Sequence, residues 1–280
     1  MLPILFEVPY LGLKVHSYGV GMFLACVSAL AITVWRARRD GLNTDAVYEL
    51  ATWLFLGGVI GARALFVLTN PGAIHSPIDL FRSWEGGNIF YGCIIGGLTG
   101  TLIYHRRHPF PFLKMADAVA PALAVGVFFG RLGCHFNGCC HGAIAQVPWA
   151  IRFPADSHAW AAHVDQGLLP LDAPWSLPVH PTQLYASIAG LILLAGLLAY
   201  APFRRRPGEV MALLMIAYPI TRWPVEILRG DDPGLFAGVT VSQLISLGLL
   251  AFGLVVWFRL GRETAAARSE EPATLEPRAA

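Results

Sequence analysis

The sequence contains few charged residues, which make up 14% of its 280 residues, whereas hydrophobic residues make up 55%. A soluble globular domain is usually about a quarter charged, so this composition excludes an ordinary soluble enzyme or binding domain. No tandem repeat and no low-complexity segment precede the polar end of the chain, which argues against a transporter built from internal repeats. The first residues also lack a basic segment followed by a small-residue cleavage site, so no cleavable signal peptide is expected.

Long apolar segments are what the chain has in abundance. Seven of them approach the roughly 20 residues needed to cross a bilayer, which predicts an all-α polytopic membrane protein. The predicted spans are 18–35, 46–68, 88–104, 115–132, 181–201, 209–228 and 239–258. Residues 1–260 would then form one transmembrane domain with an outer loop at about 133–180. The polar residues 261–280 would form a disordered cytoplasmic tail.

Basic residues predict the orientation of these spans. They cluster after the first, third, fifth and seventh spans, as Arg36, Arg38, Arg39, Arg106, Arg107, Lys114, Arg204, Arg205, Arg206, Arg259 and Arg262. If the spans alternate, all of these residues lie on one side of the membrane. The positive-inside rule therefore predicts an outer N-terminus and a cytoplasmic C-terminus.

Three arginines lie inside the predicted spans, at Arg63, Arg131 and Arg222. Ionisable residues at membrane depth are costly and usually functional. Glu226 lies four residues after Arg222 and shares its helix face, so the pair alone could simply fix helix register. The arginines nevertheless outnumber the acids there, and a guanidinium group matches phosphate oxygens bidentately. The expected ligand is therefore the phosphate of a phospholipid head group.

The cysteine-rich stretch at 130–142 leaves three alternatives open. A disulfide could join Cys134 to Cys139 or Cys140 on the outer side of the membrane. These thiols could instead bind zinc or copper together with neighbouring histidines, although the stretch has no CxxC pair and no zinc-finger spacing. They could also be small apolar groups in tight helix contacts.

Glycines four residues apart predict close packing between helices rather than a site. They are Gly57 and Gly61; Gly92, Gly96 and Gly100; and Gly126 and Gly130.

Short motifs with polar and aromatic residues open several spans on the predicted outer side. The motifs are His16-Ser17-Tyr18-Gly19, the glycine-rich segment that ends at Arg63, Trp84-Glu85-Gly86-Gly87, Asp117-Ala118-Val119-Ala120-Pro121, Gly130-Arg131-Leu132-Gly133, Asn137-Gly138, Gly142, His180-Pro181-Thr182-Gln183-Leu184-Tyr185 and the segment from Arg222 to Arg229. In their order and spacing over nearly the whole chain, they resemble those of the bacterial prolipoprotein diacylglyceryl transferases.

The resemblance implies a multi-pass enzyme of the bacterial inner membrane. It would transfer diacylglycerol from phosphatidylglycerol to the lipobox cysteine thiol that follows a prolipoprotein signal peptide, and glycerol phosphate would leave. Arg131 and Arg222 would hold the lipid phosphate, with Glu226 as their partner. The substrate-binding candidates are Tyr18, Arg63, Asn137, Gly138, Gly142, His180, Gln183, Arg229 and Cys134. We expect no metal, no redox cofactor and no nucleic-acid partner.

Three positions depart from the family pattern. Tyr91 stands where the family has a histidine expected to act as the base for the acceptor thiol, and a tyrosine of pKa about 10 is a poor base at neutral pH. We still expect Tyr91 near the nucleophile. Cys134 and Cys139 replace an asparagine and a glutamate. The sequence therefore leaves two alternatives open. The first is a related phospholipid-dependent transferase that has another acceptor or a site assisted by cysteines or a metal. The second is a membrane protein that binds or transports lipid without turnover.

Overall fold

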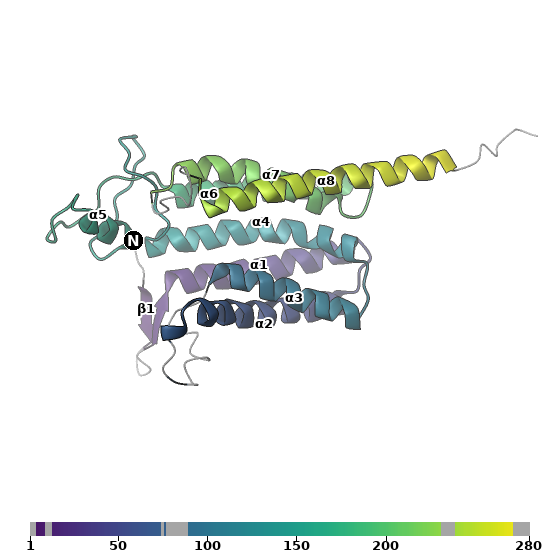
Figure 1. The fold of residues 1–280 in the computed structure, drawn as a ribbon, viewed down its shortest axis with the longest axis horizontal. Coiled ribbons are helices and arrows are strands. Elements are labelled where there is room, and N and C mark those ends of the chain that lie inside the picture. The colour runs from purple at the N-terminus through teal and green to yellow at the C-terminus, as the bar shows by residue number, and fades with distance from the viewer. Residues whose placement is uncertain (1–3, 9–12, 74–75, 77–88, 231–238, 271–280) are drawn as a thin grey trace, which may run out of the picture. The chain divides into compact units, whose positions relative to one another are not determined.

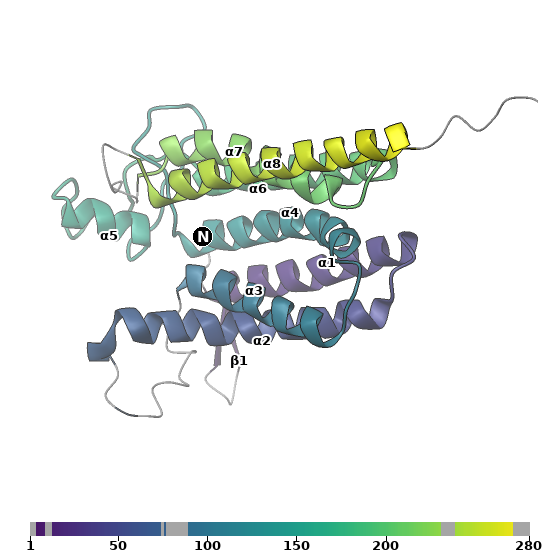
Figure 2. The ribbon, with the colours of Figure 1, turned by 45° about the vertical axis from the view of Figure 1, so that its right-hand side comes forward.

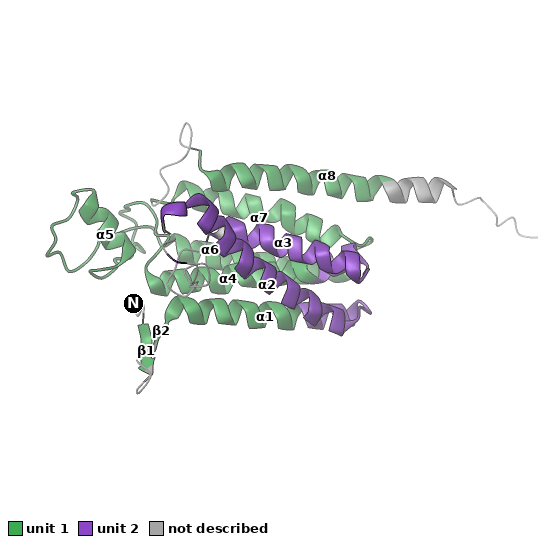
Figure 3. Ribbon diagram, turned by 60° about the horizontal axis from the view of Figure 1, so that its bottom comes forward, with its two compact units in different colours: residues 1–32, 119–280 green, residues 33–118 purple. Residues whose placement is uncertain are grey.

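The computed structural model describes residues 4–8, 13–73, 76, 89–230 and 239–270. The motif at 84–87 lies outside these residues. The chain divides into two compact units, one of residues 1–32 and 119–280 and the other of residues 33–118 (Figure 3). Each unit is described by itself below.

The first unit holds most of the helices (Figure 1). A hairpin of antiparallel strands β1 (Ile4–Val8) and β2 (Leu13–His16) leads into α1 (Ser17–Arg39). The hairpin was not predicted from the sequence. The later elements are α4 (Phe112–Asn137), α5 (His158–Asp165), α6 (Thr182–Tyr200), the short 3-10 helix η4 (Ala201–Phe203), α7 (Glu209–Ile227) and α8 (Val241–Glu270).

Helices α4, α6 and α7 share an apolar core. Small residues of α4, Ala120 and Ala124, pack with Leu193 and Leu197 of α6 and with Val210 of α7, and all five are buried. The small residues allow α4 to approach closely, as is usual between helices in a membrane. This core fixes the faces of α4 and α7 that carry the predicted arginines.

The second unit contains α2 (Thr44–Thr69), the 3-10 helix η1 (Pro71–Ala73) and α3 (Phe90–Arg107), and α2 and α3 lie side by side (Figure 2). Asn43 caps the start of α2, where its side chain accepts a hydrogen bond from the Asp45 backbone at 2.8 Å. A methyl group built on Gly96 would lie 2.1 Å from the carbonyl oxygen of Gly57, and one on Gly61 would lie 2.3 Å from that of Gly92. The close packing predicted for these glycines is therefore confirmed.

The same prediction is wrong for the glycine pair of α4. No heavy atom of the described residues comes within 4 Å of a methyl group built on Gly126, and the nearest atom to one on Gly130 is the Met22 sulfur at 4.0 Å. The four-residue spacing is identical, but within the described ranges the backbone of another helix does not come within 4 Å of a methyl group on either glycine.

Six helices in the described part of the chain are long and apolar enough to cross a membrane. They are α1, α2, α4, α6 with η4, α7 and α8. The third predicted segment is also helical, as α3, but it is not among these six. The protein is thus a polytopic helical membrane protein, and its seventh span and its orientation remain predictions.

Two predicted boundaries differ from the structure. Helix α8 continues to Glu270, whereas a disordered tail was expected from residue 261, and residues 271–280 lie outside the described part. Three consecutive alanines, the strongest helix formers, follow Thr264 and explain the longer helix. Helix α4 likewise extends to Asn137, beyond the expected start of the loop at about 133.

Candidate functional site

The centre of the candidate site is an ion pair on one face of α7. The Arg222 Nη2 atom pairs with the Glu226 Oε2 atom, and the Arg229 Nη1 atom lies 3.6 Å from the same oxygen. Arg222 is 8% exposed and Glu226 is 3% exposed. The predicted pairing of Arg222 with Glu226 is therefore observed, and Arg229 joins it.

The beginning of α8 supplies further contacts to this pair. Thr240 Oγ1 donates a hydrogen bond to Glu226 Oε1 at 2.9 Å, and Arg222 Nη2 donates one to Ser242 Oγ at 3.3 Å. Thr240 and Gln243 also cap α8 reciprocally, since each side chain accepts from the other residue's backbone N–H. These residues were not predicted from the sequence, although Thr240-Val241-Ser242-Gln243 has the spacing of a capping box.

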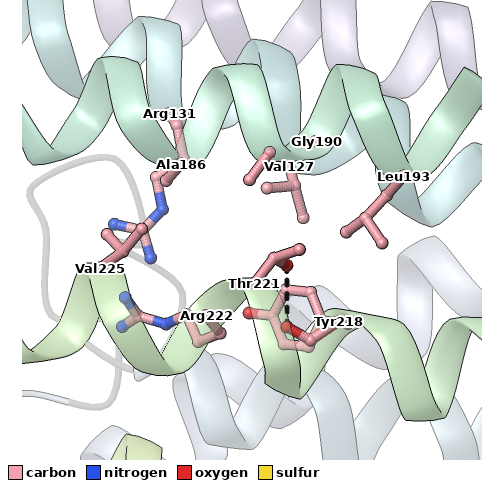
Figure 4. Close-up of a pocket in the computed structure, with 10 residues that line it drawn as sticks. Val127, Arg131, Ala186, Gly190, Leu193, Tyr218, Thr221, Arg222 and Val225 are labelled. Carbon is pink, nitrogen blue, oxygen red and sulfur yellow. Dashed lines mark hydrogen bonds between the residues drawn. The ribbon is translucent and has the colours of Figure 1, made fainter.

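Arg131 of α4 and Arg222 of α7 line the same cavity, which has a volume of about 10 Å³ (Figure 4). The Arg131 side chain extends from α4 toward the Arg222 guanidinium group. Among the described residues, Arg131 has no acid within ion-pair distance, and the buried Nη1 of Arg222 has no hydrogen-bond partner. The cavity therefore has an excess of guanidinium donors over acceptors.

Tyr18 reaches this region because α1 and α4 cross at two glycines. A methyl group on Gly21 would lie 2.8 Å from the Gly133 Cα atom, so α1 does not tolerate a side chain at the crossing. Tyr18, one turn before Gly21, is close enough to Arg131 and to the nearby cysteines to interact with their charges. The structure thus brings Tyr18 to the same end of α4 as Arg131.

The segment after α4 is held between the approaches to α6 and α8. The Gly142 N–H donates to the His180 carbonyl at 3.1 Å, and the Ala143 N–H donates to the Leu228 carbonyl at 2.8 Å. A methyl group on Gly142 would lie 2.4 Å from the His180 oxygen, so only glycine fits there. The contacts of Gly142 are thus those of a backbone support for the site.

Gln183 and Gly138 contribute to the turn that follows Asn137. Gln183, which is 1% exposed, donates from Nε2 to the Cys139 carbonyl at 2.8 Å, and its Oε1 has no partner among the described residues. Gly138 has φ +75°, a left-handed conformation that glycine adopts without strain. Asn137 itself is the last residue of α4 and is half-buried.

Three of the five cysteines gather at this turn. The sulfur atoms of Cys134, Cys139 and Cys140 all lie within 4.8 Å of one another, and none is in a disulfide. Hydrogen bonds from the thiols of Cys134 and Cys139 lower the pKa of Cys140, and the charges of Arg131 and Arg229 lower it further. The stretch singled out in the sequence is thus a compact cluster of thiols beside the arginines.

Two predicted site residues belong to the second unit. Arg63 lies on α2 with its guanidinium carbon 5.2 Å from the centre of the Phe66 ring. Tyr91 lies in the first turn of α3 and is 39% exposed. Their predicted convergence with Arg131 stays a prediction.

Comparison with known proteins adds an independent line of argument. The family model of prolipoprotein diacylglyceryl transferase matches residues 3–259. A phosphatidylglycerol–prolipoprotein diacylglyceryl transferase of Clostridium tetani is 32% identical over 257 residues, which cover 92% of this chain and 97% of that protein. Relatives with the same activity in their names are 33% identical in Legionella pneumophila, over 88% of this chain and 93% of theirs, and 34% identical in Nitratidesulfovibrio vulgaris, over 91% and 92%. The chain belongs to the prolipoprotein diacylglyceryl transferase family.

Proposed function

We propose that this protein transfers the diacylglyceryl group of phosphatidylglycerol to a cysteine thiol of a prolipoprotein. The observation that carries the proposal is the cavity lined by Arg131 and Arg222, two guanidinium groups from separate helices. Glu226 already pairs with Arg222, and Arg131 has no acid within ion-pair distance among the described residues. A phosphate would supply the missing negative charge and would accept from the orphaned Nη1 atom of Arg222. Family membership supports the same substrate.

The reaction depends most on the groups that stabilise the negative charge of the leaving phosphate. The acceptor sulfur attacks the glyceryl carbon that bears the phosphate, a carbon–sulfur bond forms, and the carbon–oxygen bond breaks to release glycerol phosphate. Preorganised donors at the place where charge develops are usually the largest catalytic contribution. Arg131 and Arg222 are proposed for this role, and Glu226 is proposed to hold Arg222 in position.

The acceptor side is proposed from the sequence. Tyr91 is expected near the attacking thiol, which must lose its proton during the reaction. Tyr18 and Asn137 are proposed to contact the lipid, as are Arg63, His180 and Arg229. Gln183 and Gly142 are better suited to support the site, because their polar groups hold the backbone of the turn. Gly138 fits the same role, since its left-handed φ makes the turn.

The cavity is small for a lipid head group. A volume of about 10 Å³ admits about one water molecule, so a phosphate enters only if the two guanidinium groups separate. Arg131 is the one to move, because it is half-buried and lacks an ion-pair partner among the described residues, whereas Arg222 is held by Glu226 and Ser242.

The proposed setting is the outer side of the bacterial inner membrane, where a prolipoprotein presents its lipobox after its signal peptide. The support is the positive-inside pattern of the basic connections. In that orientation the end of α4 that carries Arg131 faces outward.

The test is a transfer assay with labelled phosphatidylglycerol and a lipobox peptide in detergent. Arg131→Ala should lower the transfer rate by about 10²- to 10³-fold, the usual loss when one preorganised donor is removed. Arg131→Lys should recover only part of it, because an ammonium group does not bind phosphate bidentately. The matched control is Arg152→Ala, which removes an exposed loop arginine and should leave the rate unchanged.

Three outcomes would overturn the proposal. An Arg131→Ala protein that is folded and fully active would remove the phosphate site. Lipid consumption without labelling of the peptide would point to another acceptor. Stable lipid binding without any turnover would point to a lipid-binding protein.

A further inference from the structure

Cys139 and Cys140 have no assigned part in the proposed transfer, yet with Cys134 they form a cluster whose geometry is that of a binding site. Cys134 lies in the last turn of α4, and Cys139 and Cys140 follow in the turn beyond it. Their sulfur atoms form a triangle whose sides are at most 4.8 Å. The other two cysteines of the chain, Cys26 of α1 and Cys93 of α3, are not part of this group.

The backbone of the turn is fixed in the conformation that brings the thiols together. The Cys139 N–H donates to the Cys134 carbonyl at 3.2 Å. From the start of α6, Gln183 Nε2 donates to the Cys139 carbonyl at 2.8 Å and Thr182 Oγ1 donates to the Cys140 carbonyl at 3.1 Å. These two side chains are 1% and 2% exposed, so buried groups of a separate helix hold both cysteine carbonyls.

Cys140 also carries backbone strain. Its φ is +57°, in the left-handed region that a non-glycine residue seldom occupies. Such a conformation persists only where the surroundings impose it, and here the hydrogen bond from Thr182 does so. The fold thus keeps a strained residue with its sulfur directed at two others.

Three thiols at these separations match the needs of a soft metal ion. Thiolates bind zinc at about 2.3 Å, which places three sulfur atoms around one ion about 4 Å apart. The observed triangle needs only small side-chain rotations to reach that value. A disulfide would instead require two sulfur atoms at about 2.05 Å and would leave the third thiol without a role.

The surrounding charge also suits a metal–thiolate complex. Three thiolates around a monovalent or divalent cation carry a net negative charge. Arg131 lies one helical turn before Cys134 on the same face of α4, and Arg229 is close enough to interact with Cys140. Thiolate sulfur selects copper(I) and zinc over harder cations.

We propose that Cys134, Cys139 and Cys140 form a three-thiolate site for a thiophilic d¹⁰ cation, either copper(I) or zinc(II). The ion does not take part in the transfer step, so the proposed metal site can be tested independently of the proposed enzyme activity.

The experiment measures metal bound to the purified full-length protein under anaerobic, reducing conditions. One arm adds copper(I), the other adds zinc(II), and both are desalted before the metal is quantified by mass spectrometry. The wild type should retain about one ion per chain in at least one arm, and the arm that does so identifies the metal. Cys139→Ser and Cys140→Ser should each retain at most a tenth of that amount. The matched control is the double variant Cys26→Ser/Cys93→Ser, which should bind like the wild type because it keeps the cluster.

A second measurement needs no variant and therefore does not depend on how the serine proteins fold. The wild type is treated with a maleimide with and without metal, and the modified cysteines are identified by mass spectrometry. Metal should protect the three cluster cysteines several-fold and leave Cys26 and Cys93 unchanged. The proposal would be overturned if the wild type retained no more metal than Cys139→Ser in both the copper(I) and the zinc(II) arm. So would two cluster thiols that react only after reduction, because the cluster would then be a disulfide with a spare thiol.

Discussion

At the residue scale, Glu226 has the most consequential position in the site. It is the acid that pairs with Arg222, it also approaches Arg229, and it accepts a hydrogen bond from Thr240. Removing one partner of a buried ion pair leaves the other charge uncompensated and typically costs about 3–5 kcal/mol. Glu226 therefore stabilises the fold as well as the proposed phosphate site.

Glu226→Gln should lower both the stability and the transfer rate. The amide keeps the shape of the side chain but removes the negative charge that pairs with the buried Arg222, so we expect a lower melting temperature and a loss of kcat/KM of about 10²-fold or more. Glu226→Asp keeps the charge and should retain more activity. Melting curves in detergent and the transfer assay measure the two effects.

The control for Glu226 lies on the same helix. Glu209, 5% exposed, accepts from Tyr200 and from the Arg205 backbone at the opposite end of α7. Glu209→Gln should lower the melting temperature and leave the rate per folded molecule unchanged. If both glutamine variants lose activity equally, the effect of Glu226 is stability alone and its positioning role is refuted.

At the scale of the element, the crossing of α2 and α3 depends on the absence of side chains. The carbonyl oxygen of Gly57 would lie 2.1 Å from a methyl group on Gly96, a distance that no relaxation of a side chain can relieve. Backbones in such contact gain van der Waals attraction along the whole crossing, which is the main source of helix association in lipid.

Gly96→Ala should therefore force the two helices apart. Overpacking of this kind usually costs about 1–3 kcal/mol, and the melting temperature in detergent should fall. The matched control is Gly126→Ala on α4, where no heavy atom of the described residues lies within 4 Å. That variant should be slightly more stable, by about 0.5–1 kcal/mol, because alanine favours the helix over glycine. Equal melting temperatures for the two variants would contradict the role assigned to the crossing.

These two glycines also show how far the sequence can predict the structure. Local patterns were sufficient for the long apolar helices and for the Arg222–Glu226 pair, because both depend on residues within one or two turns. They did not predict the short helix α5, which lies in the segment expected to be a loop. The spacing of Gly126 and Gly130 is the same as that of Gly57 and Gly61. Among the described residues, Gly57 and Gly61 contact the backbone of another helix, whereas Gly126 and Gly130 do not. Which face of a helix meets a neighbour is a tertiary property that spacing alone does not encode.

The same distinction between local and tertiary features applies to the candidate site. Arg131 and Arg222 were predicted from the cost of charge in a membrane, and the structure brings them to one cavity. The contact between Thr240 and Glu226 was not predicted, since it joins residues on two helices. The capping-box spacing at 240–243 could have indicated where α8 begins, but not what the threonine hydroxyl would bind.

At the scale of the whole molecule, the basic residues support the prediction that α3 crosses the membrane, because one crossing more or fewer moves every later connection to the other side. With seven spans and an outer N-terminus, the connections that hold Arg106, Lys114 and Arg204 all face the cytoplasm. If α3 does not cross, every later segment changes sides, and these residues and the C-terminus face outward. That arrangement violates the positive-inside rule at several connections at once, although six helices are clearly apolar enough to span.

Reporter fusions should therefore show seven crossings. Green fluorescent protein fused after Ala280 should fluoresce, and alkaline phosphatase fused there should be inactive, because the C-terminus is predicted to be cytoplasmic. Alkaline phosphatase should be active after Asp172, an exposed residue of the outer loop, and inactive after Arg107. The decisive comparison is the fusion after Gly72 with that after Arg107, which flank α3. Active alkaline phosphatase at both positions would mean that α3 does not cross, and the C-terminal fusion would then be active as well. If alkaline phosphatase is instead active after Gly72 but inactive after Arg107 and after Ala280, α3 crosses the membrane. Arg131 and the thiol cluster then lie at the outer face, where a secreted acceptor arrives.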